Sequence, residues 1–165
     1  ETAVGQVPIF YNHKNTGRPE GFYESVFITK YLDSPNQPLF PFGYGLSYTT
    51  FEYSEIQMED KQLTRDGKLN VSVKVKNTGK YKGTETVQLY IRDLVASVTR
   101  PVKELKSFRK VELKPGEEKK VEFVITEKDL RFWNDKKQFI SEPGKFHLFI
   151  GTDSENVKKA EFVLL

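Results

Sequence analysis

The 165-residue chain contains no cysteine, which excludes disulfide bonds, thiolate metal sites and cysteine nucleophiles. No run of apolar residues approaches the ~18 that a membrane-spanning helix needs, so we expect no membrane insertion. The 26 basic and 23 acidic residues are interleaved along the sequence rather than clustered. Proteins that bind nucleic acid usually gather basic residues on one face, so this pattern indicates an ordinary solvated surface and no nucleic-acid partner.

Side chains that bind metals or phosphates are also scarce. His13 and His147 are the only histidines, and a zinc site usually needs three protein ligands, so we predict no metal. No serine stands in the Gly-x-Ser-x-Gly pattern of α/β-hydrolases. Gly43 and Gly45 are not followed by the helix start and basic residue that a phosphate-binding loop requires. The sequence therefore predicts no cofactor.

Acidic pairs for catalysis are not evident either. Hydrolysis of a glycosidic bond needs two carboxylates held across the scissile bond. The first forty residues offer Glu20, Glu24 and Asp33, but nothing marks any two of them as facing each other. The remaining acidic residues fall in turns or at outward strand positions. We therefore predict no catalytic residue in this chain.

Alternating apolar and polar residues dominate the chain after residue 51, which is typical of half-buried antiparallel strands. The regular segments are 69–76, 86–92, 121–125, 146–150 and 162–164. Segments 51–58 and 108–113 each change parity once, which indicates a β-bulge. Seven strands with a turn about every ten residues predict an all-β fold, a seven-stranded sandwich of fibronectin type III or immunoglobulin character. Without the Cys…Trp…Cys pattern, the fibronectin-like form is favoured.

One short helical element is expected among the strands. Residues 126–129 resemble a capping box with Asp129 in place of glutamate, and they predict one helical turn through residue 133.

The first fifty residues follow a different pattern. Residues 4–12 are an apolar run interrupted by Pro8, which predicts an edge strand, the last strand of a preceding α/β domain. Residues 13–39 show no sustained period and are expected to form an interdomain arm, with one turn of helix or strand at 22–32. We assign 1–50 to the arm and linker and 51–165 to the sandwich domain. The opening at Glu1, with no methionine or signal peptide, leads us to expect a segment of something longer.

Residues 40–51 join the arm to the sandwich and contain five aromatics, two glycines and a proline. Such a run predicts an irregular backbone bent around packed rings, since glycine tolerates positive φ and close approach. Two interpretations stay open: rings that seal a domain boundary, or a sugar-stacking platform. We assign interdomain packing to six residues here: Phe40, Phe42, Gly43, Tyr44, Gly45 and Tyr48.

Two further features are candidate contacts. Phe149 points opposite to Phe146 and Leu148, onto a face that is otherwise polar, and is the seventh predicted interdomain packing residue. The loop 97–103 is rich in β-branched and basic residues. We interpret it as a connector, with contact to a partner as the alternative.

Residues 39–51, Leu-Phe-Pro-Phe-Gly-Tyr-Gly-Leu-Ser-Tyr-Thr-Thr-Phe, closely resemble the signature that joins the catalytic body of family 3 glycoside hydrolases to their C-terminal fibronectin type III-like domain. The resemblance covers essentially the whole chain. It continues at 75–79, 87–90, 100–108, 113–117 and 151–154. Residues 4–13 and 15–19 are similar to the end of the family's α/β sandwich domain.

The resemblance implies that the parent is a retaining β-glucosidase or a related exo-acting β-glycosidase, periplasmic or secreted as in bacterial members of the family. The family's nucleophilic aspartate and acid/base glutamate belong to upstream domains and have no counterpart here. The implied role is a non-catalytic module that braces the catalytic domains of its own polypeptide, while the parent binds a β-glucoside or oligosaccharide. The alternatives are a carbohydrate- or cell-wall-binding module and, less favoured by the polar surface, an adhesion domain.

Overall fold

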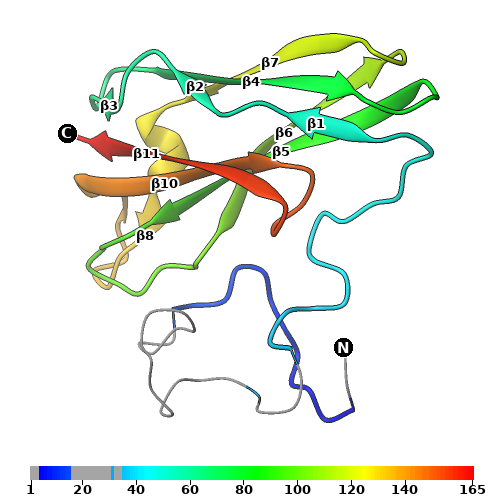
Figure 1. Ribbon diagram of the computed structural model, residues 1–165. Helices are drawn as coiled ribbons and strands as arrows, with labels where there is room; N and C mark the ends of the chain where they lie inside the picture. The colour runs from blue at the N-terminus through cyan, green and yellow to red at the C-terminus, as the bar shows by residue number, and fades with distance from the viewer. Residues whose placement is uncertain (1–3, 16–30, 32–34) are drawn as a thin grey trace.

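The computed structural model describes residues 4–15, 31 and 35–165. Its alternating strands form two sheets that bury their apolar faces against each other (Figure 1). In the first sheet, three strands pair antiparallel with β4 (Leu69–Asn77): β1 (Phe51–Tyr53), β2 (Gln57–Met58) and β7 (Glu118–Ile125). The second sheet has the order β3 (Gln62–Leu63), β11 (Val157–Leu164), β10 (Gly144–Gly151), β5 (Gly83–Asp93) and β6 (Glu104–Leu113). This all-β sandwich confirms the predicted fold class.

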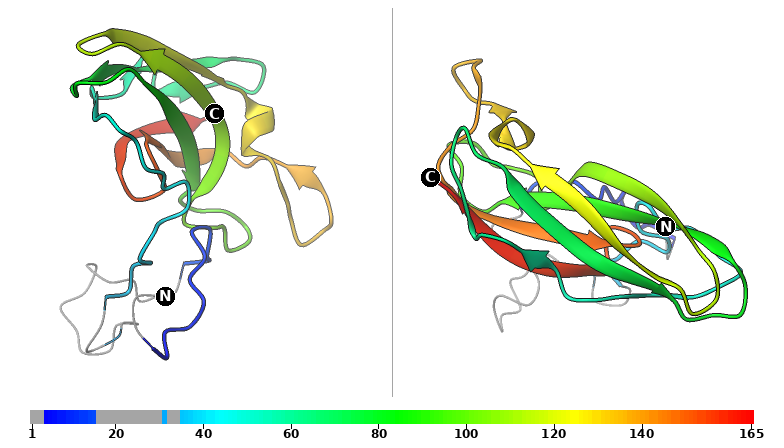
Figure 2. Two further views of the ribbon diagram at one scale, coloured as in Figure 1. Left: turned by 90° about the vertical axis from the view of Figure 1, so that its right-hand side faces the viewer. Right: turned by 90° about the horizontal axis from the view of Figure 1, so that it is seen from above.

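A small subdomain follows β7. It consists of the 3-10 helix η1 (Glu127–Leu130) and a separate hairpin of β8 (Phe132–Trp133) and β9 (Phe139–Ile140). The two views of Figure 2 show this hairpin projecting beyond the edge of the two sheets.

The core lies between the sheets and contains the inward residues of the long strands. Phe146 and Phe162 face each other across β10 and β11, and their rings stack with centroids 5.3 Å apart. The other buried core residues include those expected from the alternation: Val71, Val73, Val75, Val87, Leu89, Ile91, Val121, Phe123, Ile125, Leu148, Ile150 and Leu164. The period-2 pattern therefore identified the core face of every regular strand correctly.

One irregular segment agrees with expectation and the other agrees only in part. In residues 51–58 the register against β4 shifts by one residue, because Tyr53 pairs with Val75 whereas Gln57 pairs with Ser72, and this confirms the predicted bulge. In β6 the extra residue is Lys106, because Leu89 pairs with Ser107 whereas Tyr90 pairs with Leu105. Since no bulge follows Phe108, this residue faces away from the core and is 54% exposed.

Three other expectations are wrong or fall outside the described part. Residues 4–12 form no strand, and among the described residues the arm makes only one isolated bridge, between Lys14 and Pro101. The helical turn ends at Leu130, because the next residues pair with β9. The element expected at 22–32, apart from residue 31, and the carboxylates of Glu20, Glu24 and Asp33 lie outside the described residues. The described part has no helix long and apolar enough to cross a membrane.

Candidate functional site

The arm meets the sandwich on the outer face of the five-stranded sheet, below it in Figure 1. Residues that alternate with the core positions of β5 point to this face, and two of them, Gln88 and Tyr90, are buried there. The covering residues come from the arm and from the turn between β10 and β11. Among the described arm residues, Tyr11 meets this face at Tyr90, and Phe42 stacks on Tyr11.

The side-chain amide of Gln88 lies at the centre of this contact. Its Nε2 donates hydrogen bonds to the carbonyl oxygens of Gly43 (3.0 Å) and Thr152. Its Oε1 accepts a hydrogen bond from the Tyr90 hydroxyl (2.5 Å), and burial raises the pKa of that hydroxyl. If the arm left the sheet, the Gln88 amide would lose its bond to Gly43, whereas its other two partners, Thr152 and Tyr90, belong to the sandwich itself. Losing one hydrogen bond of a buried polar group is costly.

Gly43 allows this close approach. Its φ is +82°, and a Cβ at this position would lie 2.1 Å from Oε1 of Gln88. Only glycine fits both the conformation and the space. A Cβ on Gly45 would meet nothing within 4 Å, so the close approach that the sequence suggested for both glycines occurs at Gly43 alone.

Aromatic stacking reinforces the contact. The rings of Tyr11 and Phe42 are 4.0 Å apart and nearly parallel, and Tyr11 meets buried Tyr90 edge-on at 6.0 Å. The backbone nitrogen of Ser154 donates a 2.9 Å hydrogen bond to the carbonyl oxygen of Phe42. The first part of the arm, the linker and the sheet are therefore joined by one continuous stack.

The loop 97–103, before β6, makes a second set of contacts with the arm. Val102 donates its backbone N–H to the carbonyl oxygen of His13 (2.9 Å), next to the bridge between Lys14 and Pro101. The ammonium group of Lys103 lies 4.9 Å from the centroid of the Phe149 ring and donates a hydrogen bond to the carbonyl of Ser154. Burial lowers the pKa of Lys103. The loop 97–103 thus contacts a partner segment within its own chain.

Phe149 points to the outer face, as its position in β10 predicts, but it is only 9% exposed. Lys103 covers the ring, and His147 meets it edge-on at 6.0 Å. Any part that Phe149 plays in interdomain packing would therefore act through Lys103. Its direct contact with another domain stays a prediction.

Several other rings are left uncovered by the described residues. Phe40 (63% exposed) and Tyr44 (45%) have ring centroids 5.1 Å apart, and Phe42 is 45% exposed. Phe108 stands on the same sheet face, directly across from Gln88 in β5. We call these four residues the arm aromatic surface. Phe108 was missed as a site residue. The available signal was strand alternation: Phe108 lies an odd number of positions from inward Val111 and Leu113, so an unbroken strand would point it outward.

Tyr48 lies apart from that cluster. It is 97% exposed, and none of the ring contacts within the described residues involves it. A role in packing between domains remains a prediction for this residue.

Buried carboxyl groups serve the sandwich rather than an open cleft. Glu85 accepts a 2.7 Å hydrogen bond from the Tyr53 hydroxyl, and burial raises the pKa of both groups. Burial alone would raise the pKa of Asp153, but hydrogen bonds from Asn156 and Glu155 hold it below its ordinary value. Among the described residues, no three histidine or acidic side chains gather as a metal site.

Comparison with known proteins supplies the family. Residues 85–154 match the fibronectin type III-like domain family. The chain is 49% identical over 164 residues, 99% of its length, to a periplasmic β-glucosidase of Salmonella typhimurium, and 55% identical over 123 residues, 74% of its length, to the β-glucosidase BoGH3A of Bacteroides ovatus. These alignments cover 21% and 16% of the two relatives, so the chain spans about a fifth of their length.

A solved structure agrees with the sequence relatives. A crystal structure of β-glucosidase from Listeria innocua in complex with glucose superposes with a TM-score of 0.86 at 42% identity, covering 97% of this chain and 22% of that one. The fold, the domain match and the relatives together show that this chain resembles the C-terminal fibronectin type III-like part of family 3 β-glucosidases.

Proposed function

We propose that this chain is the non-catalytic C-terminal module of a family 3 β-glucosidase and braces the catalytic domains of the same polypeptide. The parent would hydrolyse terminal non-reducing β-D-glucosyl residues. Relatives named β-glucosidase that are about five times longer than this chain support that assignment. The name of the Salmonella relative supports a periplasmic or secreted location.

One observation carries the bracing role: the Gln88 amide fixes the arm at Gly43, on the outer face of a rigid sheet. This hydrogen bond holds the rings of the arm aromatic surface close to the sheet while they stay exposed. Burying such rings against another domain would stabilise the assembly by about 25 cal/mol per Å² of apolar area. Large exposed apolar patches usually mark interaction sites.

The same geometry supports a division near residue 50, as the sequence suggested. Within the described part of the chain, the hydrophobic core draws on residues 51–164, whereas the arm contacts the sheet from outside. Residues 1–50 would then act as the connection to the preceding domain, and residues 51–165 as the brace. Gly45 and Tyr48 would belong to the exposed stretch between the two parts.

Association in trans tests the proposal. The catalytic portion of the proposed parent, prepared without this module, should bind the 165-residue chain and gain thermal stability and β-glucosidase activity. The chain alone should be inert on an aryl β-glucoside. Phe42→Ala and Phe108→Ala should each weaken the association, while Val95→Ala, at an exposed apolar residue elsewhere, serves as the matched control. Turnover by the isolated chain, or equal binding by all variants, would refute the bracing role.

A further inference from the structure

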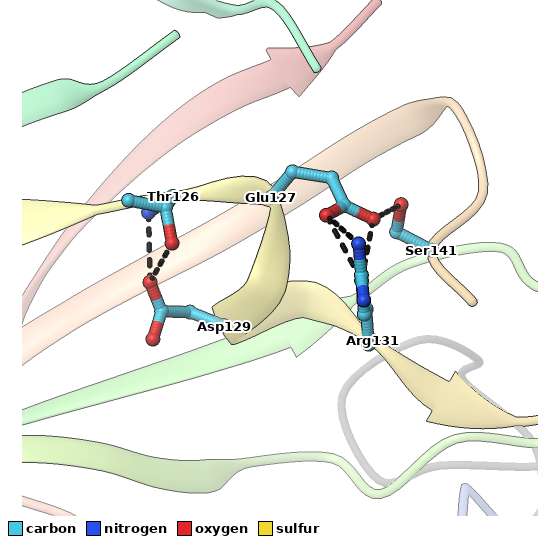
Figure 3. A network of polar contacts seen from close by, with 5 residues as sticks. All are labelled: Thr126, Glu127, Asp129, Arg131 and Ser141. Carbon is cyan, nitrogen blue, oxygen red and sulfur yellow. Dashed lines mark hydrogen bonds and ion pairs between the residues drawn. The ribbon is translucent and has the colours of Figure 1, made fainter. Parts of the chain in front are cut away.

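The β8–β9 hairpin is anchored at its base by one buried carboxylate, that of Glu127 (Figure 3). Arg131, just before β8, contacts both oxygens of this carboxylate at 2.8–3.0 Å. Ser141, just after β9, donates a hydrogen bond to the same carboxylate at 2.6 Å. Glu127 therefore fastens both strands of the hairpin, and η1 itself is fixed by Thr126, whose N–H and hydroxyl donate to Asp129.

The buried side chain of Phe132, the first residue of the hairpin, provides a second anchor. Phe132 is 3% exposed, and the guanidinium of Arg100 lies 4.5 Å from the centre of its ring. At the tip, Asn134 and Gln138 hydrogen-bond to each other through backbone and side-chain groups. Isolated two-stranded hairpins are marginally stable in water, so these anchors make the hairpin a firm support.

This support presents two aromatic rings to solvent. Trp133 and Phe139 are directly paired across the hairpin, with ring centroids 5.3 Å apart and an interplanar angle of 41°. They are 66% and 49% exposed. Among the residues that the structure describes, neither ring belongs to the core or to the ring and hydrogen-bond contacts that hold the arm. The pair is therefore available to a ligand, on a part of the fold that bracing does not use.

The surroundings of the pair favour a saccharide over a protein. Fully buried aromatic side chains cover about 150–250 Å² each, so two rings fall well short of the ~800 Å² per partner of a stable protein interface. The neighbouring side chains are charged or amide groups: Asn134, Asp135, Lys136, Lys137 and Gln138. Aspartate and lysine are depleted in protein interfaces, whereas amides and charges beside an aromatic ring suit the hydroxyls of a sugar.

We propose that the β8–β9 hairpin is a carbohydrate-binding site, in which Trp133 and Phe139 stack on the apolar faces of neighbouring pyranose rings. β-Linked glucose presents such flat C–H faces because its hydroxyls are equatorial. That the ligand is a β-glucan rests on the proposed function of the parent, whereas the saccharide class follows from the hairpin. The site would hold a polymer near the enzyme without taking part in hydrolysis.

The experiment uses the fact that Trp133 is the only tryptophan in the chain. Cellohexaose and laminarihexaose are titrated into the 165-residue chain while tryptophan emission is recorded, with mannohexaose as the third probe. We expect a saturable change in emission with at least one of the three. Phe139→Ala should weaken that binding about tenfold, and calorimetry should show a similar loss for Trp133→Ala.

Two controls separate this site from the domain contact. Phe108→Ala and Phe42→Ala should leave saccharide binding unchanged, because those rings lie on the arm aromatic surface. No saturable signal with any hexasaccharide at about 10 mM would overturn the proposal. If Phe108→Ala lost as much saccharide affinity as Phe139→Ala, the proposal would also be overturned. It would be overturned as well if Trp133→Ala bound saccharide normally but no longer associated with the catalytic portion. Binding to mannohexaose alone would support a saccharide site at the hairpin but would contradict a β-glucan as its ligand.

Discussion

At the scale of single residues, the junction depends on a glycine and an amide that fit each other. Gly43 supplies a positive φ and an empty Cβ position, and Gln88 fills the space with hydrogen-bonding atoms. The sequence predicted a tight backbone here from the glycine-rich run. It could not name Gln88, because a polar residue at an outward strand position ordinarily faces solvent, and its partner is 45 residues away.

Replacing Gly43 should loosen the arm. Gly43→Ala combines an unfavourable φ with a clash against Gln88, so we expect a loss of about 1–2 kcal/mol, which would remove most of the arm's contribution to stability. Limited proteolysis within the arm, followed together with the thermal midpoint, measures this. Gly45→Ala is the control and should change stability by less than about 0.5 kcal/mol. Identical cleavage rates for the two variants would contradict the close-packing account.

Asp93 should give the chain a pH-dependent stability. Burial raises the pKa of this carboxyl from 3.8 to about 6, with Arg100 opposing the shift and Glu142 and Glu104 adding to it. The folded state then binds the proton more tightly than the unfolded state. The free energy of unfolding should therefore fall as pH rises from about 4 to about 6, and stay level above that.

Asp93→Asn isolates this contribution from that of Glu85, whose pKa is also raised. Because Asp93 is only partly buried, we expect its share of the pH dependence to be about 1 kcal/mol. Urea unfolding at several pH values measures the free energy of unfolding of the variant and of the unsubstituted 165-residue chain. A variant with the same slope between pH 4 and 6 would show that Asp93 titrates normally.

At the scale of elements, the regular strands were predictable and the small subdomain was not. Each regular strand carries its own period-2 pattern, which local sequence is enough to reveal, whereas the bulge in β6 put Phe108 on the unexpected face. β8 and β9 have two residues each, too few for any period, and their anchors come from Glu127, Arg131 and Ser141, which meet only in three dimensions. The capping box at Thr126 did reveal where η1 begins, because that contact is local.

Removing the carboxylate of Glu127 should release the hairpin. Glu127→Ala leaves Arg131 and Ser141 without their shared acceptor, so we expect a loss of about 1–3 kcal/mol and a shift in the emission of Trp133. Glu122→Ala is the matched control, because its ion pair with Lys120 on β7 is solvent-exposed and should contribute less than about 1 kcal/mol. Equal effects of the two substitutions would show that the buried network does not anchor the hairpin.

At the scale of the whole molecule, the sandwich contains a complete core without the arm. Residues 51–165 should therefore fold cooperatively by themselves, with a thermal midpoint only a few degrees lower than that of the full chain, because the arm contributes about 1–2 kcal/mol at most through Tyr11 and Phe42. Calorimetry of the shortened chain measures this. A broad, non-cooperative transition would show that residues 1–50 belong to the folding unit.

The Gln88 amide has a mechanical consequence for the junction. Its bonds with Thr152 and Tyr90 hold the side chain within the sandwich, so Gln88 offers Gly43 a donor that cannot follow the arm. Because a hydrogen bond weakens steeply with poor geometry, a small shift of the arm would already break it. The junction should accordingly have two states, seated or released, with little elastic range between them. A force applied at Phe42 would pass directly to β5 in the middle of the sheet. Strain from the neighbouring domain would therefore release the arm from the sheet once the force passed a threshold, instead of bending the junction gradually.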